Sequence, residues 1–255
     1  MNILVCIKRV PAPGTKIVLT DDEQEIVTRN LGFAISPHEE CAVEEAVRLI
    51  EKYGGTSTVL TLGPEGAIEQ LRGSLAIGIE HATLLETDGG EWDPIATSKA
   101  IVEAVRTLED EGNQFDMLFF GNESADSGGY QVGIRVAHAL DLPCVSGIKG
   151  LEIEDDGTAI AKREASGGWE LYEVELPAVF TMKEGINLPR YPPMRGRLRA
   201  KRKNINRIEP EWDGGGLKKV RLKNPPEQGS TVEILGNSVD AVPQIIEILT
   251  ELGMV

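Results

Sequence analysis

The stretch FDMLFFGNESADSGGYQVGIRVAHAL, at residues 115–140, contains the pattern that decides the fold. Its apolar run at 115–121 predicts a buried strand, and residues 128–140 predict a helix. The turn between them is rich in glycine, which allows the backbone to approach a ligand closely. A strand that leads through a turn directly into a helix is the building unit of α/β proteins.

Strand and helix patterns alternate in the same way over most of the first 148 residues. This alternation predicts a doubly wound, mostly parallel sheet with helices on both faces, as in Rossmann-like proteins that bind adenine nucleotides. Asp93 and Pro94 suit the N-cap and the first position of one helix. The predicted strands lie at 3–7, 56–63, 82–86, 115–121 and 143–148, and the predicted helices at 37–55, 65–78, 93–112 and 128–140.

The pattern changes from Lys149 onward. Residues 151–182 predict antiparallel strands, because turn residues at 155–157 and 166–168 separate runs of strand-forming residues. The first 182 residues are therefore predicted to form one α/β domain that carries additional antiparallel strands.

An extended arm is predicted to follow this domain, over residues 183–255. Residues 183–230 are rich in Pro, Gly, Lys and Arg and show little periodicity, and such a length is unusual for a simple loop. The arm ends in a predicted amphipathic helix at 238–255. We therefore expect the arm to serve a function or to bind a partner.

Composition limits the classes of function. The net charge of −15 argues against binding to nucleic acid, and the chain has no apolar run long enough to span a membrane. Its first residues lack the charge order of a secretory signal. The three cysteines have neither disulfide nor zinc spacing, so we expect buried thiols and a cytoplasmic location.

The basic residues are distributed unevenly. Residues 181–207 contain nine basic residues and one acid, whereas the rest of the chain is strongly acidic. A basic segment can lie on the acidic surface of its own protein, or it can wrap around a partner subunit. The sequence leaves both interpretations open.

A ligand is expected at the carboxyl ends of the strands, where the strand-to-helix turns lie. The turns are at 6–9, 36–39, 61–64 and 121–131, and the last has the richest chemistry. Ser127 or Asp126 is predicted to cap the helix that follows, leaving N–H groups to bind phosphate. The turn matches no P-loop or dinucleotide fingerprint, so phosphate binding and a purely structural turn remain equally open.

Catalytic patterns are scarce in the chain. There is no Gly-x-Ser-x-Gly motif, and the three histidines show no metal-binding spacing. His38 and Glu39 open a helix beside an expected ligand turn, although a structural role is common for such residues. A nucleotide site without an acid, base or nucleophile predicts binding rather than turnover.

These motifs together resemble the electron transfer flavoprotein beta subunit family along almost the whole chain. The order and spacing of the motifs carry the resemblance. They are VCIKRVP at 5–11, P-x-x-x-x-AVEEAVRL at 37–49, TLGP at 61–64, G-x-x-x-x-D-x-x-x-x-QVG at 121–133, KREASGGWELYEVELPAVFTM at 162–182, NLPRYPPM at 187–194 and NPPEQGSTVEIL at 224–235.

The resemblance implies an electron carrier without catalytic residues of its own. It implies a heterodimer with an alpha subunit that holds most of a redox-active FAD, while the beta subunit buries a structural AMP. Electrons would come from dehydrogenases, such as those for acyl-CoA, and pass toward a quinone-linked oxidoreductase. The implied AMP pocket comprises Cys6, Ser36, Pro37, His38, Glu39, Leu62, Gly63, Gly121, Asn122, Glu123, Ser124, Ala125, Asp126, Ser127, Gly128, Gly129, Tyr130, Gln131 and Val132.

The resemblance also implies how partners bind. The basic segment after Tyr191 would embrace the alpha subunit. Ile186, with Leu188 as the second choice, would be the exposed aliphatic residue that anchors dehydrogenases.

The chain departs from the family pattern where Ser36 replaces an Asn, His38 an aromatic residue, and Pro13 a tyrosine. In addition, the usual acidic run of the nucleotide turn is thinned to Asp-Ser-Gly-Gly at 126–129. These departures keep open an electron-bifurcating protein with a second FAD in the beta pocket. A stand-alone ATP-binding protein or enzyme is the alternative from another class.

Overall fold

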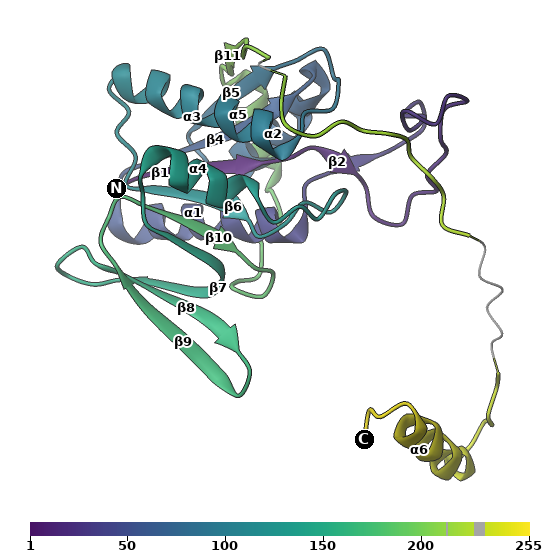
Figure 1. Ribbon diagram of the computed structural model, residues 1–255. Helices are drawn as coiled ribbons and strands as arrows, with labels where there is room; N and C mark the ends of the chain where they lie inside the picture. Colours follow the sequence, from purple (N-terminus) through teal and green to yellow (C-terminus); the bar gives the residue numbers. More distant parts are fainter. Residues whose placement is uncertain (213, 227–232) are drawn as a thin grey trace.

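The computed structural model describes residues 1–212, 214–226 and 233–255, and its centre is one nine-stranded sheet. The strand order is β11-β5-β4-β1-β6-β10-β7-β8-β9 (Figure 1). Because residues 227–232 are not among the described residues, the motif at 224–235 is described only in part. The strands of this sheet are β1 (Asn2–Ile7), β4 (Thr56–Gly63), β5 (His81–Glu86), β6 (Met117–Gly121), β7 (Cys144–Ile153), β8 (Ala159–Ala165), β9 (Gly168–Val174), β10 (Ala178–Met182) and β11 (Asn206–Ile208).

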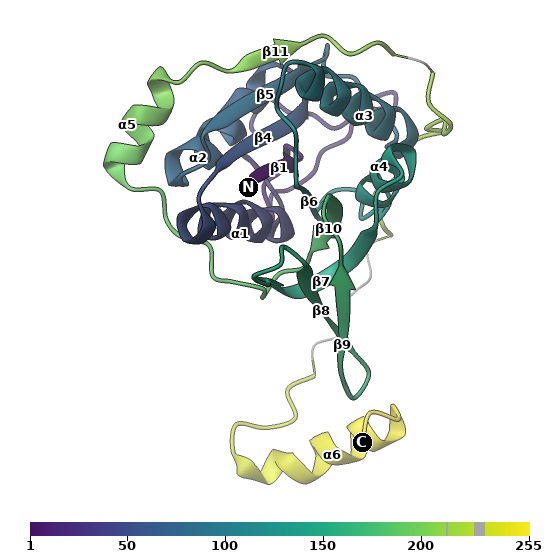
Figure 2. The same ribbon diagram turned by 90° about the vertical axis from the view of Figure 1, so that its left-hand side faces the viewer.

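Helices cover both faces of the parallel part of the sheet (Figure 2). The helices α1 (Pro37–Tyr53) and α2 (Ile68–Ile77) pack on one face, and α3 (Pro94–Asp110) and α4 (Val132–Leu140) pack on the other. Alternate residues of β1 enter the two cores, because successive side chains of a strand point to opposite faces. The predicted doubly wound, mostly parallel fold is confirmed.

The helix starts follow from local sequence. Ser36 caps α1 with Pro37 directly after it, and the Asp93 carboxylate caps α3 in front of Pro94. Gly54 ends α1 with a φ of 75°, a conformation that other residues rarely adopt. These boundaries agree with the prediction.

The strand β10 corrects the sequence prediction. Its residues were expected among the antiparallel strands, but β10 is parallel to both β6 and β7 and lies between them. All five of its residues are buried. A strand covered on both faces reads as a continuous apolar run, which is the signature of a parallel strand inside a sheet. Only β7, β8 and β9 form the antiparallel extension, with turns at the predicted glycines.

The beginning of the arm is more regular than predicted. It contains α5 (Met194–Arg202) and then β11, which extends the sheet by pairing with β5. Gly196 and Ala200 face α2, and a Cβ on Gly196 would come within 2.1 Å of the Ala76 carbonyl oxygen. The buried face of α5 consists of two small residues rather than large apolar ones. The hydrophobic pattern of the sequence therefore did not predict this helix.

The arm is then fastened across the N-terminus of α3. The Asp93 carboxylate accepts hydrogen bonds from the backbone N–H groups of Gly216 and Leu217 as well as capping its own helix. The ring of Trp212 meets Trp92 edge to face at 4.8 Å between centroids. Three short elements complete the body: β2 (Val10–Pro11), β3 (Phe33–Ala34) and the 3₁₀ turn η1 (Glu65–Ala67).

The predicted C-terminal helix is present as α6 (Val242–Glu251), preceded by the 3₁₀ turn η2 (Val239–Ala241). Ser238 caps the turn through its hydroxyl. None of the residues of α6 is buried, and Figures 1 and 2 show the helix standing apart from the α/β body.

Candidate functional site

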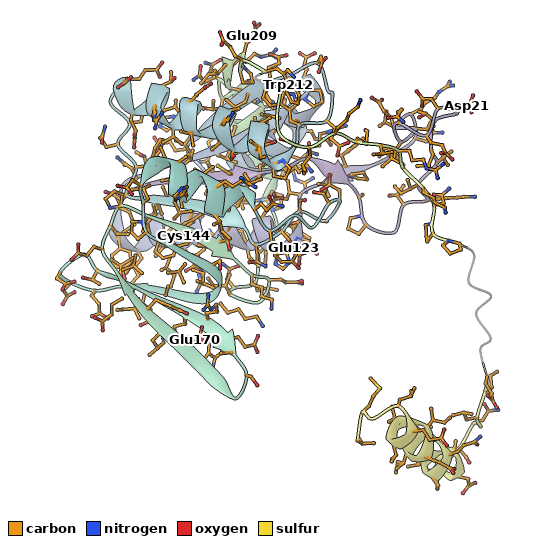
Figure 3. The ribbon with its side chains drawn as sticks, in the orientation of Figure 1. Asp21, Glu123, Cys144, Glu170, Glu209 and Trp212 are labelled. Carbon is orange, nitrogen blue, oxygen red and sulfur yellow. The ribbon has the colours of Figure 1, made fainter. Side chains whose placement is uncertain are left out.

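The candidate site is a hollow of about 390 Å³ at the carboxyl edge of the sheet. It lies beside the junction of β1 and β6, where the chain changes from adding strands on one side of β1 to adding them on the other. Ligands of open α/β sheets bind at such a switch point. Figure 3 labels Glu123 on the loop after β6. The hollow is lined by Ser36, Pro37, His38, Glu123, Ser124, Ala125, Asp126, Ser127 and Gly128.

One wall is the N-terminal turn of α1. The Ser36 hydroxyl accepts a hydrogen bond from the Glu39 N–H and donates one to the Glu123 carbonyl oxygen at 3.1 Å. The Glu39 carboxylate in turn accepts from the backbone N–H groups of Ser36 and Lys8, at 2.9 Å and 2.8 Å. This capping box joins the ends of β1, α1 and the loop after β6 into one wall.

Glu39 is buried beneath the hollow rather than exposed in it. Burial raises the pKa of Glu39 to about 8, although hydrogen bonds from the backbone of Ser36 and Lys8 oppose that shift. Burial, with a smaller contribution from Glu39, also raises the pKa of the Cys6 thiol. Cys6 is therefore a protonated core residue and not a thiolate.

The opposite wall holds an ion pair. The Lys8 ammonium lies 2.6 Å from the Asp126 carboxylate. Burial of Asp126 acts to raise its pKa, but Lys8 and hydrogen bonds involving Ser124 and Ser127 outweigh burial and lower it. The pair fixes the middle of the loop to the end of β1. Lys8 was absent from the predicted pocket, although it follows directly after the first buried strand.

His38 connects the hollow with the start of the arm. Its Nδ1 atom accepts a hydrogen bond from the Glu184 backbone N–H at 2.7 Å, so the proton of the neutral ring lies on Nε2. That Nε2 atom is 3.3 Å from the Glu123 carboxylate. Both ring nitrogens of His38 thus have partners, and the hydrogen bond from the Glu184 N–H fixes the tautomer.

The glycine-rich turn delays the start of the helix that follows it. Gly128 and Tyr130 adopt positive φ angles of 54° and 53°, which keep the chain from entering the helix early. The helix α4 begins only at Val132, after Gln131, and has no side-chain cap. The predicted capping by Ser127 or Asp126 is wrong, because the helix starts several residues later and Asp126 is paired with Lys8. The N–H groups of the first turn of α4 remain without a side-chain cap.

Several residues of the predicted pocket lie outside its lining and support it. Gly121 leaves room for α1, since a Cβ there would come within 2.6 Å of the Glu39 side chain. The Asn122 side chain accepts a hydrogen bond from the Thr181 hydroxyl, and Gln131 accepts two from Arg135. Cys6, Leu62, Gly63, Gly129, Tyr130 and Val132 also lie outside the lining.

The two candidates for partner recognition differ in exposure. Ile186 is partly buried and packs against the core, whereas Leu188 is 90% exposed. On exposure alone Leu188 is the better candidate for a partner contact, while the preference for Ile186 that the resemblance implies stays a prediction. Tyr191 and Met194, which the sequence analysis did not single out, are 94% and 72% exposed in the same stretch.

Two kinds of feature are absent from the described residues. No group of three or more His, Cys, Asp or Glu side chains among them could hold a metal ion. In the described part of the chain, no helix has the length and hydropathy needed to cross a bilayer.

The fold and the hollow define a doubly wound α/β protein with its candidate ligand site at the switch point of the sheet. The family model described as "Electron transfer flavoprotein domain" matches residues 25–212. The chain therefore belongs to the electron transfer flavoprotein family, and specifically resembles its beta subunits over nearly its full length.

Three relatives illustrate the similarity, and each bears the name electron transfer flavoprotein subunit beta. The protein of Bacillus subtilis is 34% identical, with 98% of this chain and 97% of the relative covered. That of Thermoanaerobacterium thermosaccharolyticum is 33% identical, with 97% of each chain covered. The protein of Mycobacterium tuberculosis is 35% identical over 91% of this chain and 86% of the relative. Family membership supports a role in electron transport as part of a flavoprotein.

Proposed function

We propose that this chain is the beta subunit of a heterodimeric electron carrier. With an alpha subunit it would hold FAD, accept electrons from dehydrogenases such as acyl-CoA dehydrogenases, and pass them toward a quinone-linked oxidoreductase. The observation that carries the proposal is similarity over nearly the whole length to proteins named as beta subunits. The chain would supply nucleotide binding and partner contacts rather than catalytic groups, in a reducing compartment such as the cytoplasm.

The hollow suits a structural AMP. Its volume of about 390 Å³ lies within the range of small-molecule pockets. Phosphate would bind backbone N–H groups at the uncapped start of α4, where the helix dipole favours an anion, because the Gly128 N–H already donates to the Ser124 carbonyl oxygen. The carboxylate of Glu123 would repel phosphate, so it suits hydroxyl or amino groups of the ligand.

The far end of the arm supports binding to an alpha subunit. The residues Val242, Ile245 and Ile246 of α6 are 42–53% exposed, and the helix has only ten residues. An amphipathic helix of this length is marginal in water unless its apolar face is covered. We propose that the alpha subunit covers this face in the heterodimer, and that the arm at 183–255 is the part of the chain that reaches it.

The start of the arm would dock the dehydrogenases. Leu188 is an aliphatic side chain held almost fully in solvent, and Tyr191 and Met194 enlarge the exposed apolar surface. Ile186 is better placed to anchor the segment in the core than to contact a partner. We therefore propose Leu188 as the contact residue and Ile186 as its support.

Co-expression with an alpha subunit of the same family tests the proposal. The purified heterodimer should release one FAD and one AMP per complex on denaturation, measured by chromatography and mass. Two FAD and no AMP would establish the electron-bifurcating alternative. A stable monomer without nucleotide that turns over a substrate by itself would contradict the carrier function.

A further inference from the structure

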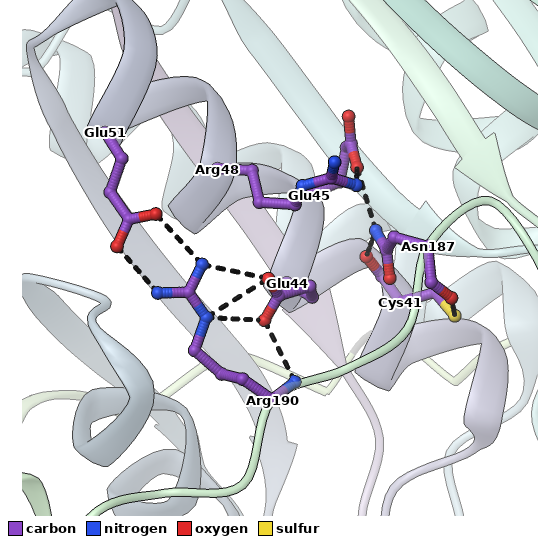
Figure 4. A network of polar contacts seen from close by, with 7 residues as sticks. All are labelled: Cys41, Glu44, Glu45, Arg48, Glu51, Asn187 and Arg190. Atoms are coloured by element: carbon purple, nitrogen blue, oxygen red, sulfur yellow. Dashed lines mark hydrogen bonds and ion pairs between the residues drawn. The ribbon is translucent and has the colours of Figure 1, made fainter.

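The first residues of the arm lie along α1, from the hollow to the far half of the helix. Glu184 donates its N–H to His38, and the Asn187 side chain donates to the Cys41 carbonyl at 2.9 Å and to Glu45 at 2.8 Å. Figure 4 shows that Arg190 continues this series of contacts toward the C-terminal half of the helix. The segment 184–190 is therefore fixed to three successive stretches of α1.

Arg190 makes the strongest of these contacts. Its guanidinium bonds both oxygens of Glu44, with Nε at 2.9 Å from Oε2 and Nη2 at 2.9 Å from Oε1. The same group reaches the two oxygens of Glu51 at 2.6 Å and 2.9 Å, and the Arg190 N–H bonds Glu44 as well. We call this arrangement of Arg190, Glu44 and Glu51 the arginine clamp.

The chemistry of the arginine clamp requires a guanidinium. The hydrogen bonds that Arg190 donates to Glu51, and then those to Glu44, raise the pKa of Arg190, so the group is charged at any physiological pH. The Glu44 side chain is only 5% exposed, so loss of its partner would leave a carboxylate without a counter-charge in the interior. A lysine ammonium is a point charge and cannot bridge two carboxylates with the planar fork of arginine.

The arginine clamp lies between the exposed apolar side chains of the segment. Leu188 and Tyr191, which are 90% and 94% exposed, stand two positions before and one position after Arg190. A contact residue on a fixed backbone loses less conformational entropy on docking than one on a mobile loop. The clamp thus holds apolar side chains in water where a free segment would move or collapse onto the body.

We propose that Arg190 is a positioning residue that sets the pose of the docking segment 188–194 through Glu44 and Glu51. The inference rests on the proposed docking role of Leu188. Arg190 itself faces α1 and needs no contact with the partner, so its effect is on recognition and not on the flavin.

The experiment uses the assembled heterodimer with a reduced acyl-CoA dehydrogenase as electron donor. Arg190→Gln should raise the KM for the dehydrogenase about fivefold or more, with kcat and bound FAD within about twofold of wild type. Arg190→Lys should fail to restore the KM. Arg207→Gln is the matched control, because Arg207 also bridges two glutamates, Glu65 and Glu86, but on the edge strand β11 rather than on α1.

A second measurement keeps the inference testable without a partner. Amide hydrogen exchange over 184–194 should accelerate at least tenfold in Arg190→Gln, while exchange in the sheet stays unchanged. In a double-mutant cycle, Leu188→Ala should abolish the further effect of Arg190→Gln on KM if the arginine acts through Leu188.

Two results separate the inference from the proposed function. A wild-type KM for Leu188→Ala would contradict the docking role, while faster exchange in Arg190→Gln would still support positioning. Unchanged amide hydrogen exchange in Arg190→Gln would overturn the positioning role. So would a fall in kcat and bound FAD as large as the rise in KM.

Discussion

The helix α1 buries Glu39 in its first turn, the pocket end, and Glu44 near its middle, where the arginine clamp begins and which we call the clamp end; the two carboxylates are stabilised by different means. At the pocket end, Glu39 accepts hydrogen bonds from two backbone N–H groups, and no described residue forms an ion pair with it. At the clamp end, Glu44 receives the guanidinium and the backbone N–H of Arg190. Both carboxylates are about 5% exposed or less, so burial alone does not distinguish them.

The difference distinguishes a candidate ligand site at one end of α1 from a contact that holds the arm at the other. The cation at the pocket end, Lys8, forms its ion pair with Asp126 on the loop and not with Glu39, although its charge lowers the Glu39 pKa slightly. The polar groups there can respond to pH and to a ligand. The clamp end has its charges matched inside the chain and can only hold the arm in place. One helix therefore joins the proposed ligand pocket to the proposed docking segment.

The largest effect is expected from pH at the pocket end. Burial raises the pKa of Glu39 from 4.5 to about 8, so the folded protein binds this proton more tightly than the unfolded chain does. The stability that proton binding by Glu39 contributes is complete below about pH 4.5. It is lost between about pH 4.5 and 8, at up to about 1.4 kcal/mol per pH unit. Urea unfolding between pH 5 and 9 measures it.

Glu39→Gln is the control for this pH dependence. An amide binds no proton in this range, so the difference in unfolding free energy between wild type and variant should shrink as pH rises. Glu45, whose pKa burial also raises, is present in both proteins and cancels from the difference. Parallel curves for the two proteins would show that Glu39 is already ionised at pH 5.

The clamp end should respond to mutation rather than to pH. Glu44→Gln should lower the unfolding free energy by about 2 kcal/mol, because Arg190 then faces a buried amide in place of a carboxylate. Glu51 is 58% exposed on its side chain, and Glu51→Gln should cost under about 1 kcal/mol. Equal losses for the two variants would mean that the arginine clamp does not depend on burial.

Much of this architecture could be predicted from the sequence, since strand and helix periods are local signals. The predicted order of β1, α1, β4, α2, β5, α3, β6 and α4 agrees with the structure. The strand β10 and the helix α5 could not be placed in the same way. Burial of β10 on both faces depends on β6 and β7, and α5 packs through Gly196 and Ala200 against a helix far away in the chain.

The gathering of several predicted site residues at one hollow could be expected from the sequence, because the carboxyl ends of parallel strands share one edge. Ser36, His38 and the loop at 123–128 line it together, as the predicted site required. The partners of these residues could not be predicted. The pairing of Lys8 with Asp126 and the contact of His38 with Glu184 join segments about 120 and 146 positions apart, and no local pattern encodes such contacts.

A smaller effect is expected from the ion pair beside the hollow. Asp126→Asn frees the Lys8 ammonium and loosens the loop, and we expect retention of AMP by the heterodimer to fall about tenfold. Gln131→Ala should change it less, because that side chain is bound to Arg135 and lies outside the lining. Equilibrium dialysis with AMP measures both variants. Equal retention in Asp126→Asn and wild type would show that the ion pair does not shape the pocket.

The smallest effect is expected from the basic residues beyond the arginine clamp, which extend the comparison along the arm. Arg197, Arg199 and Lys201 on α5 form no ion pair with the described residues, in contrast to Arg190 and Arg207. Reversing these three charges should leave the unfolding free energy of the chain nearly unchanged and weaken its binding to the alpha subunit about fivefold at low salt. The loss should disappear toward 1 M salt, where the screening length is about 3 Å.

Dissociation constants measured across a salt series would decide the point, and identical values for variant and wild type at every salt concentration would mean that α5 faces only solvent. The basic segment would then serve the chain entirely through the residues that it pairs with its own acidic surface.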